Sequence, residues 1–238
     1  MLRRNLTFLV LACTSLCACS HTEQNASAPP KAIAHSSPSS ASVQNTVAAA
    51  TSSQAQAPKK SYGGPFGLAM GISLSEAKQL LPSLSENSDG TFTATTVPTP
   101  HEAFESYILV FSSKSGLCKI VAIGKDIQSG DNGFEVQSAF DDLSQGLSKK
   151  YGHGKKYDRV TGSMDEPQFW MMTLSEKNRM LAEIWDAEDG ATLPKELSGI
   201  ALEAHASNLR TGFINLSYQF ANFNDCIEEN KEKDNKGL

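Results

Sequence analysis

The sequence predicts an α+β fold in which an antiparallel sheet of six or seven strands carries two helices on one face. Two observations lead to this prediction. Apolar residues recur at helical spacing in two segments, and each of these segments begins with a capping signal. The other apolar segments are short, and in the last of them apolar and polar residues alternate, as in an antiparallel strand buried on one side. The apolar positions of that segment are Ile214, Leu216, Tyr218 and Phe220.

The first helix is predicted directly after Ser73. Ser73 and Glu76 have the spacing of a capping box, and Pro82 marks the end of the helix. One face of this helix is apolar and consists of Leu74, Ala77, Leu80 and Leu81.

Three strands are expected next, at residues 91–97, 105–111 and 117–124. The segment 112–116, Ser-Ser-Lys-Ser-Gly, separates the last two and has the composition of a turn. These two strands should therefore form a hairpin.

The second helix follows this hairpin. Asn132 with Glu135 offers an N-terminal cap, and Gly152 stands where the end of a helix favours a positive φ. The apolar face between them consists of Val136, Phe140, Leu143 and Leu147.

Four more strands are predicted after the second helix. In the third of them Glu203 and His205 should point outward, while the alternate residues point into the core. The chain thus runs twice from a helix into strands, which indicates a duplicated unit. The four strands are expected at residues 169–174, 180–185, 198–206 and 213–220.

The N-terminus has the features of an export signal. Arg3 and Arg4 precede an apolar run from Leu6 to Cys17, which is far shorter than the roughly 20 residues that a membrane-spanning helix needs. The run ends in Leu-Cys-Ala-Cys, with Cys19 as the last residue. This order resembles the lipobox of bacterial lipoproteins, in which signal peptidase II cuts before a cysteine that carries a diacylglycerol.

The resemblance implies that residues 1–18 are removed and that Cys19 is acylated, with palmitate or similar chains holding the protein to a membrane. Ser20 stands where an aspartate retains enterobacterial lipoproteins in the inner membrane, so the resemblance favours the outer membrane, facing the periplasm. The alternatives are the inner membrane, or a soluble periplasmic protein whose ordinary secretory signal is cut after Ala18 or Ser20.

Composition divides the rest of the chain. Residues 20–60 contain no aromatic residue and no leucine, so the segment 19–60 is expected to be a disordered Ser/Ala/Pro/Gln-rich tether behind the lipid. Residues 61–227 read as a single α+β domain, and residues 228–238 as a charged flexible tail.

Two cysteines remain once the signal peptide and Cys19 are set aside. Cys118 and Cys226 are candidates for one disulfide, because exported proteins meet an oxidising environment. The alternative is a pair of buried thiols. Neither cysteine belongs to a Cys-x-x-Cys motif, so the sequence favours neither a redox centre nor zinc.

One set of apolar residues is a candidate partner or ligand patch. If the segments 169–174 and 180–185 are adjacent strands, their Trp and Met side chains gather at one place, and such residues are enriched at interfaces. The alternative is that they fill the core. The residues are Trp170, Met171, Met172 and Trp185.

No motif indicates a catalytic, metal or cofactor site. His101 and Glu102 with Glu105 are the only grouping that suggests metal ligands, and their spacing does not support it. There is no phosphate-binding Gly-Lys-Ser/Thr and no nucleophile elbow. The formal net charge of −5 gives no indication of nucleic-acid binding.

The segment Leu68-Ala-Met-Gly-Ile-Ser-Leu-Ser-Glu-Ala77 is similar to the opening of BamE-like outer-membrane lipoproteins and of the β-lactamase-inhibitor-protein fold. This resemblance implies a non-enzymatic scaffold that binds another envelope protein, as an assembly accessory, an inhibitor or an immunity factor. Two alternatives stay open: a carrier of a lipid or other apolar ligand, and an enzyme that acts on the envelope.

Overall fold

The structure is a computed structural model that describes residues 63–235. The predicted signal peptide, the candidate lipidation site Cys19 and the predicted tether lie outside the described residues. Within the described part of the chain, no helix is long and apolar enough to cross a membrane.

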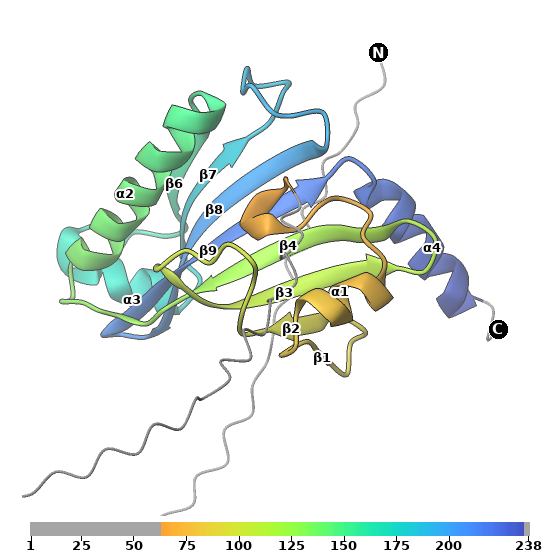
Figure 1. Ribbon diagram of the computed structural model, residues 1–238. Coiled ribbons are helices and arrows are strands. Elements are labelled where there is room, and N and C mark those ends of the chain that lie inside the picture. Colours follow the sequence, from red (N-terminus) through yellow and green to blue (C-terminus); the bar gives the residue numbers. More distant parts are fainter. Residues whose placement is uncertain (1–62, 236–238) are drawn as a thin grey trace, which may run out of the picture. The chain divides into compact units, whose positions relative to one another are not determined.

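The described chain has an α+β fold built on one antiparallel sheet of nine strands, which confirms the predicted fold class (Figure 1). The last strand, β9, lies in the middle of the sheet and also pairs with the short strand β5 (Ile127–Gln128). The remaining order across the sheet is β1 (Ser85–Glu86), β2 (Phe92–Ala94), β3 (Phe104–Ser112), β4 (Gly116–Gly124), β9 (Thr211–Phe220), β8 (Leu197–Asn208), β7 (Arg179–Trp185) and β6 (Lys155–Val160).

The sheet consists of two meanders that meet at their last strands. A helix, α1 (Leu74–Leu80), precedes β1 to β4, and a longer helix, α2 (Phe134–Tyr151), precedes β6 to β9. β4 and β9 pair antiparallel in the centre, with Val121 opposite Ser217. The chain therefore runs twice from a helix into antiparallel strands, but η2 and α3 interrupt the second half between β6 and β7.

Both predicted helices form. Ser73 caps α1 with the full capping box, in which the Ser73 side chain accepts from the Glu76 amide and the Glu76 carboxylate accepts from the Ser73 amide. Helix α2 ends at Gly152, whose φ is +81°. Its N-cap, however, is Gly133 and not Asn132. Position 133 needs a glycine, because its φ is +67° and an added Cβ would lie 1.8 Å from the Trp170 ring.

The predicted strand at 169–174 is wrong. These residues form the end of a short 3-10 helix, η2 (Pro167–Phe169), and then helix α3 (Trp170–Ser175). A short apolar run without clear alternation fits a buried helix as well as a strand. Tertiary contacts decide here, since the Met171 amide donates to the Asp131 carbonyl beside α2.

Several other elements were not predicted, among them the short strands β1 and β5, the strand β6 and a helix at the end of the domain. The strand β6 is mostly exposed and charged, so it lacks the alternation that marks a half-buried strand. Helix α4 (Phe223–Asn235) crosses position 227, where the sequence analysis placed the end of the domain, and includes the first part of the charged tail. Figure 1 shows α4 beside the turn that joins β3 and β4.

The core lies on the face of the sheet that α2 and α3 cover. α2 packs on β8 and β9, and α3 packs on β7 and β8. In the first half of the domain the 3-10 helix η1 (Pro65–Gly67) places Phe66 edge-on against Phe104, Tyr107 and Tyr218. We call this side the helix-packed face and the opposite side of the sheet the distal face.

Candidate functional site

The distal face carries a row of residues that crosses seven strands and has an apolar majority. Strand registers place each member of the row opposite the next, so their side chains share this face. Helices α2 and α3 lie on the other side of the sheet. Ala201 and Ser217 at the centre of the row are buried, Lys155 is exposed, and the other members are half-buried. In order across the sheet, the row consists of Thr93, Ile108, Val121, Ser217, Ala201, Ile184 and Lys155.

A polar cluster lies beside this row, on the central strands. Asn215 of β9 stands between Ile123 of β4 and Glu203 of β8. His205 follows Glu203 on the same face of β8, and its ring stacks on Phe213 of β9 at a centroid distance of 5.3 Å. The sequence predicted that Glu203 and His205 point away from the core, and the registers confirm this.

Glu203 and His205 form a close pair. Oε2 of Glu203 lies 3.8 Å from Nε2 of His205, a distance that suits an ion pair when the imidazole is protonated and is too long for a hydrogen bond. Nε2 of His205 and Oδ1 of Asn215 are both buried, and neither has a hydrogen-bond partner among the described residues. An activated nucleophile would be hydrogen-bonded to this nitrogen, and no hydroxyl or thiol of the described residues is.

Lys119 adds a cation to this face. It lies on β4 between Val110 of β3 and Gln219 of β9. Burial lowers the pKa of the Lys119 ammonium, and the negative charge of Glu203 counteracts part of this shift. The pKa of Glu203 is itself lowered, first by its contact with the His205 ring and further by the charges of His205 and Lys119, while burial acts in the opposite direction.

Helix α4 borders the distal face near Lys119. The Lys119 ammonium lies 5.6 Å from the centroid of the Phe223 ring. One turn further on, Cys226 forms a disulfide with Cys118 of β4, with a Cα–Cα distance of 6.5 Å. This confirms the predicted bridge and fixes α4 to the hairpin of β3 and β4.

Polar groups hold α4 at the same place. The Glu229 carboxylate accepts from the Lys114 amide at 3.0 Å and from the Ser115 hydroxyl at 2.6 Å. The Asn222 amide donates to the carbonyls of Ser115 and Leu117. Among the α4 side chains that the structure describes, only Cys226 is fully buried.

The sequence-predicted patch of Trp and Met residues is not a surface patch. Trp170 and Met171 are buried in α3, and Trp185 is buried on β7, where its indole N–H donates to the Gly152 carbonyl at 2.8 Å. Only Met172 is partly exposed. Trp170 and Met171 of α3 and Trp185 of β7 fill the core between the sheet and the helices.

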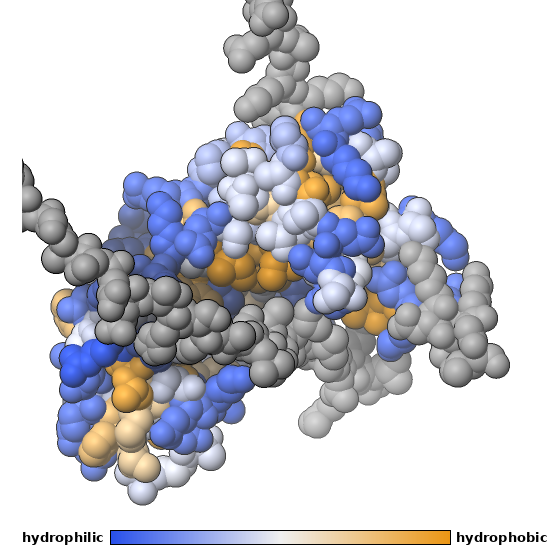
Figure 2. Space-filling model, turned by 90° about the horizontal axis from the view of Figure 1, so that it is seen from below, coloured by the Kyte–Doolittle hydropathy of each residue, from blue (hydrophilic) through white to orange (hydrophobic). Residues whose placement is uncertain are grey.

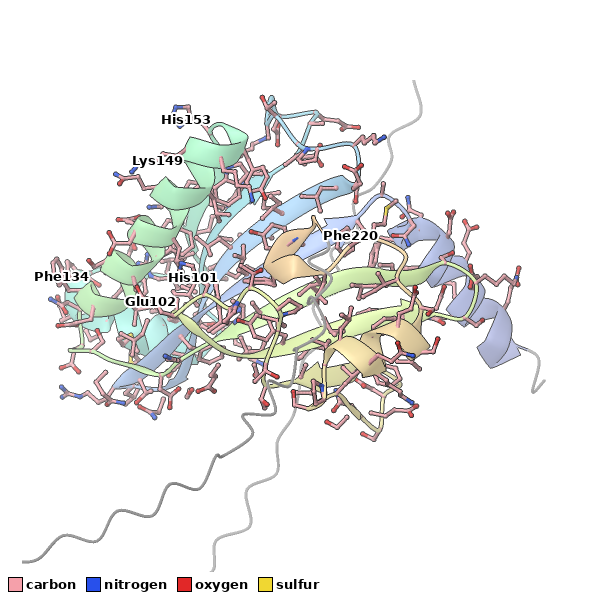
Figure 3. The ribbon with its side chains drawn as sticks, in the orientation of Figure 1. His101, Glu102, Phe134, Lys149, His153 and Phe220 are labelled. Atoms are coloured by element: carbon pink, nitrogen blue, oxygen red, sulfur yellow. A yellow bond between two sulfur atoms is a disulfide. The ribbon has the colours of Figure 1, made fainter. Side chains whose placement is uncertain are left out.

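The histidines that suggested metal ligands lie in separate places. Figure 3 places His153 just beyond the end of α2 and His101 with Glu102 on the loop before β3. Among residues 63–235, no three His, Cys, Asp or Glu side chains are grouped so that they could hold a metal ion.

Large apolar side chains are seldom strongly exposed. Seen from below, the surface is largely hydrophilic, with separate apolar areas (Figure 2). One strongly exposed residue lies on the distal face: Met180 of β7, opposite Arg159 of β6. The other strongly exposed apolar side chains of the described residues are Met70, Phe134, Met164 and Leu209.

Comparisons with protein-family models, with curated proteins and with solved structures find no match for this chain.

Proposed function

We propose that this protein is a non-enzymatic lipoprotein of the cell envelope and that its domain binds another protein through the distal face of the sheet. The observation that carries the proposal is the row across the distal face, whose half-buried apolar members are Ile108, Val121 and Ile184. The row lies opposite α2 and α3 and beside the polar cluster of Glu203, His205 and Asn215.

The composition of the distal face suits a protein partner. Protein interfaces combine an apolar centre with polar groups that fix the orientation of the partner. Ile108, Val121 and Ile184 supply apolar area, while Glu203 and His205 supply charge beside it. A sheet holds these groups rigidly, so little side-chain and backbone freedom is lost when a partner docks.

The N-terminal sequence supports the location. The lipobox-like segment before Cys19 implies a lipid anchor, and Ser20 favours the outer membrane. The disulfide between Cys118 and Cys226 is of the kind that persists in oxidising compartments such as the periplasm. The resemblance of the segment before Ala77 to BamE-like and inhibitor-type scaffolds supports a binding role rather than catalysis.

The binding proposal is tested by site-specific photo-crosslinking in cells that make the full chain. The photoreactive amino acid p-benzoylphenylalanine replaces Val121 on the distal face and, as a matched control, Lys195 on the connection between β7 and β8, whose side chain is 91% exposed. A defined protein crosslinked from position 121 and not from position 195 is the expected result. If position 121 yields no specific crosslink, a binding role for this face is excluded.

The anchor is tested separately. Metabolic labelling with an alkyne analogue of palmitate should mark the wild-type protein and leave Cys19→Ala unlabelled. Intact-mass measurement of the purified protein covers the alternative carrier function, because a co-purifying lipid in the folded domain would favour that function instead.

A further inference from the structure

Resting on this proposed function, we infer that the partner is a protein with an acidic docking segment, which places a carboxylate against Lys119 and apolar side chains against Val110 and Val121 on the distal face.

Among the residues that the structure describes, Lys119 has no anion at contact distance. No carboxylate oxygen of the described residues lies within 4 Å of its ammonium group, although eight other ion pairs of the domain meet that limit. Glu203 acts on Lys119 only through space and is in closer contact with His205, at 3.8 Å. The lysine is therefore free to pair with an incoming carboxylate.

The surroundings of Lys119 are already poor in water. Its cross-strand neighbours are Val110 and Gln219, its neighbour along the same face of β4 is Val121, and the Phe223 ring of α4 lies beneath its ammonium group. Partial burial lowers the pKa of this lysine, because the loss of water disfavours the charged ammonium form. A partner that covered Val121 and Val110 would remove the remaining water.

Glu203 acts on Lys119 only through space, so covering the ammonium group without a carboxylate at contact distance is costly, and a neutral or basic partner would bind this face poorly. A carboxylate placed at Lys119 removes that cost and gains a charge-assisted hydrogen bond in a medium of low dielectric constant. The net charge of the whole chain is −5, so general attraction does not draw an acidic partner. The preference for an acidic partner arises from Lys119 alone, and it makes binding specific.

The test uses the protein crosslinked from position 121 as the probe. Its affinity is measured for the wild-type full chain and for Lys119→Glu, Lys119→Gln, Lys119→Arg and the distant control Lys195→Glu. We expect Lys119→Glu to weaken binding about 30-fold or more, as is usual when one member of a buried charge pair is lost. Lys119→Gln should weaken binding in the same direction, and Lys119→Arg and Lys195→Glu should stay within about threefold of the wild type.

A charge swap completes the test. The Asp or Glu of the partner that lies nearest to the residue crosslinked from position 121 is replaced by lysine. This replacement should restore binding to Lys119→Glu. Circular dichroism melts of each variant show that the fold is kept, and Lys119→Gln stands in if Lys119→Glu does not fold.

Unchanged affinity of Lys119→Glu and Lys119→Gln for the crosslinked partner would refute the acidic segment and leave the binding function intact. Absence of any crosslink from position 121 would overturn both proposals together. Lys119-dependent binding to vesicles that contain anionic phospholipid, with no protein crosslinked, would show that the anion belongs to a lipid headgroup and would also overturn the inference.

Discussion

Removal of the disulfide between Cys118 and Cys226 should lower the free energy of unfolding by about 4 to 5 kcal/mol. The two cysteines are 108 positions apart in the sequence. A bridge that closes a loop of about 100 residues restricts the unfolded chain by about 4.7 kcal/mol in the chain-entropy model. For a domain of this size, such a loss lowers Tm by roughly 10 to 20 °C.

The effect should come mainly from the unfolded chain, because the folded state keeps its other contacts with α4. Glu229 still binds the Lys114 amide and the Ser115 hydroxyl, and Asn222 still binds the neighbouring carbonyls. The assay is urea unfolding followed by tryptophan fluorescence, without reductant, for Cys118→Ala, Cys226→Ala and the double variant. The control Ser115→Ala removes one hydrogen bond and should cost only about 1 kcal/mol.

The three cysteine variants together decide whether the reasoning holds. Either single substitution removes the whole bridge, so each single variant should lose as much stability as the double variant. A loss below about 1 kcal/mol would refute the loop-closure argument, since the model assigns several times that amount to a loop of this length. If the double variant instead lost the sum of the two single losses in stability, the effect could not come from one shared bond.

Substitutions at four positions elsewhere give further predictions, all measured by urea unfolding. Ser73→Ala removes the capping box of α1 and should cost about 1 kcal/mol, and Ser73→Asp, which keeps a capping oxygen, should restore most of it. Trp185→Ala empties a fully buried site and should cost about 3 to 5 kcal/mol; a cost near zero would show that the core had collapsed around it. Gly146→Ala, in the middle of α2 with open space around the added methyl, should stabilise by about 0.5 to 1 kcal/mol. Gly133→Ala should destabilise the domain, because φ is +67° there and the methyl meets Trp170; equal effects of the two glycine substitutions would contradict this assignment.

Much of the fold could be predicted because local patterns were strong where burial was one-sided. The alternation in residues 213–220 correctly assigned one side of β9 to the core, but Ser217 and Gln219 on the other side are buried as well. The capping box at Ser73 and the glycine at 152 correctly marked a start and an end of helices. These signals depend on neighbouring residues only, so a single sequence contains them in full.

The misses have a common cause, since each element owes its conformation to contacts with distant parts of the chain. Residues 169–174 form a helix because α3 docks between the start of α2 and the strands β7 and β8. The strand β6 forms as the edge partner of β7 without an apolar face of its own. Helix α4 lies against the hairpin at Ser115, where Cys226 and Glu229 hold it.

The candidate site shows the same division. The outward direction of Glu203 and His205 followed from alternation within one strand and is confirmed. Lys119 was not singled out, because its place beside this pair depends on β4 pairing with β9, a strand about 100 residues later in the chain. Pairing between distant strands is chosen by the packing of the whole sheet, and no local pattern specifies it.

The sequence by itself determined the α+β class, the two main helices, the alternation of the central strands and the cysteine pair that forms the bridge, because periodicity, caps and residue chemistry act locally. Only the tertiary structure decided that the Trp and Met residues are core, that α4 borders the sheet, and that Val121, Lys119 and Glu203 share one face. Those outcomes depend on which strands become neighbours, and neighbours in a sheet are selected by the burial of apolar surface across the entire domain.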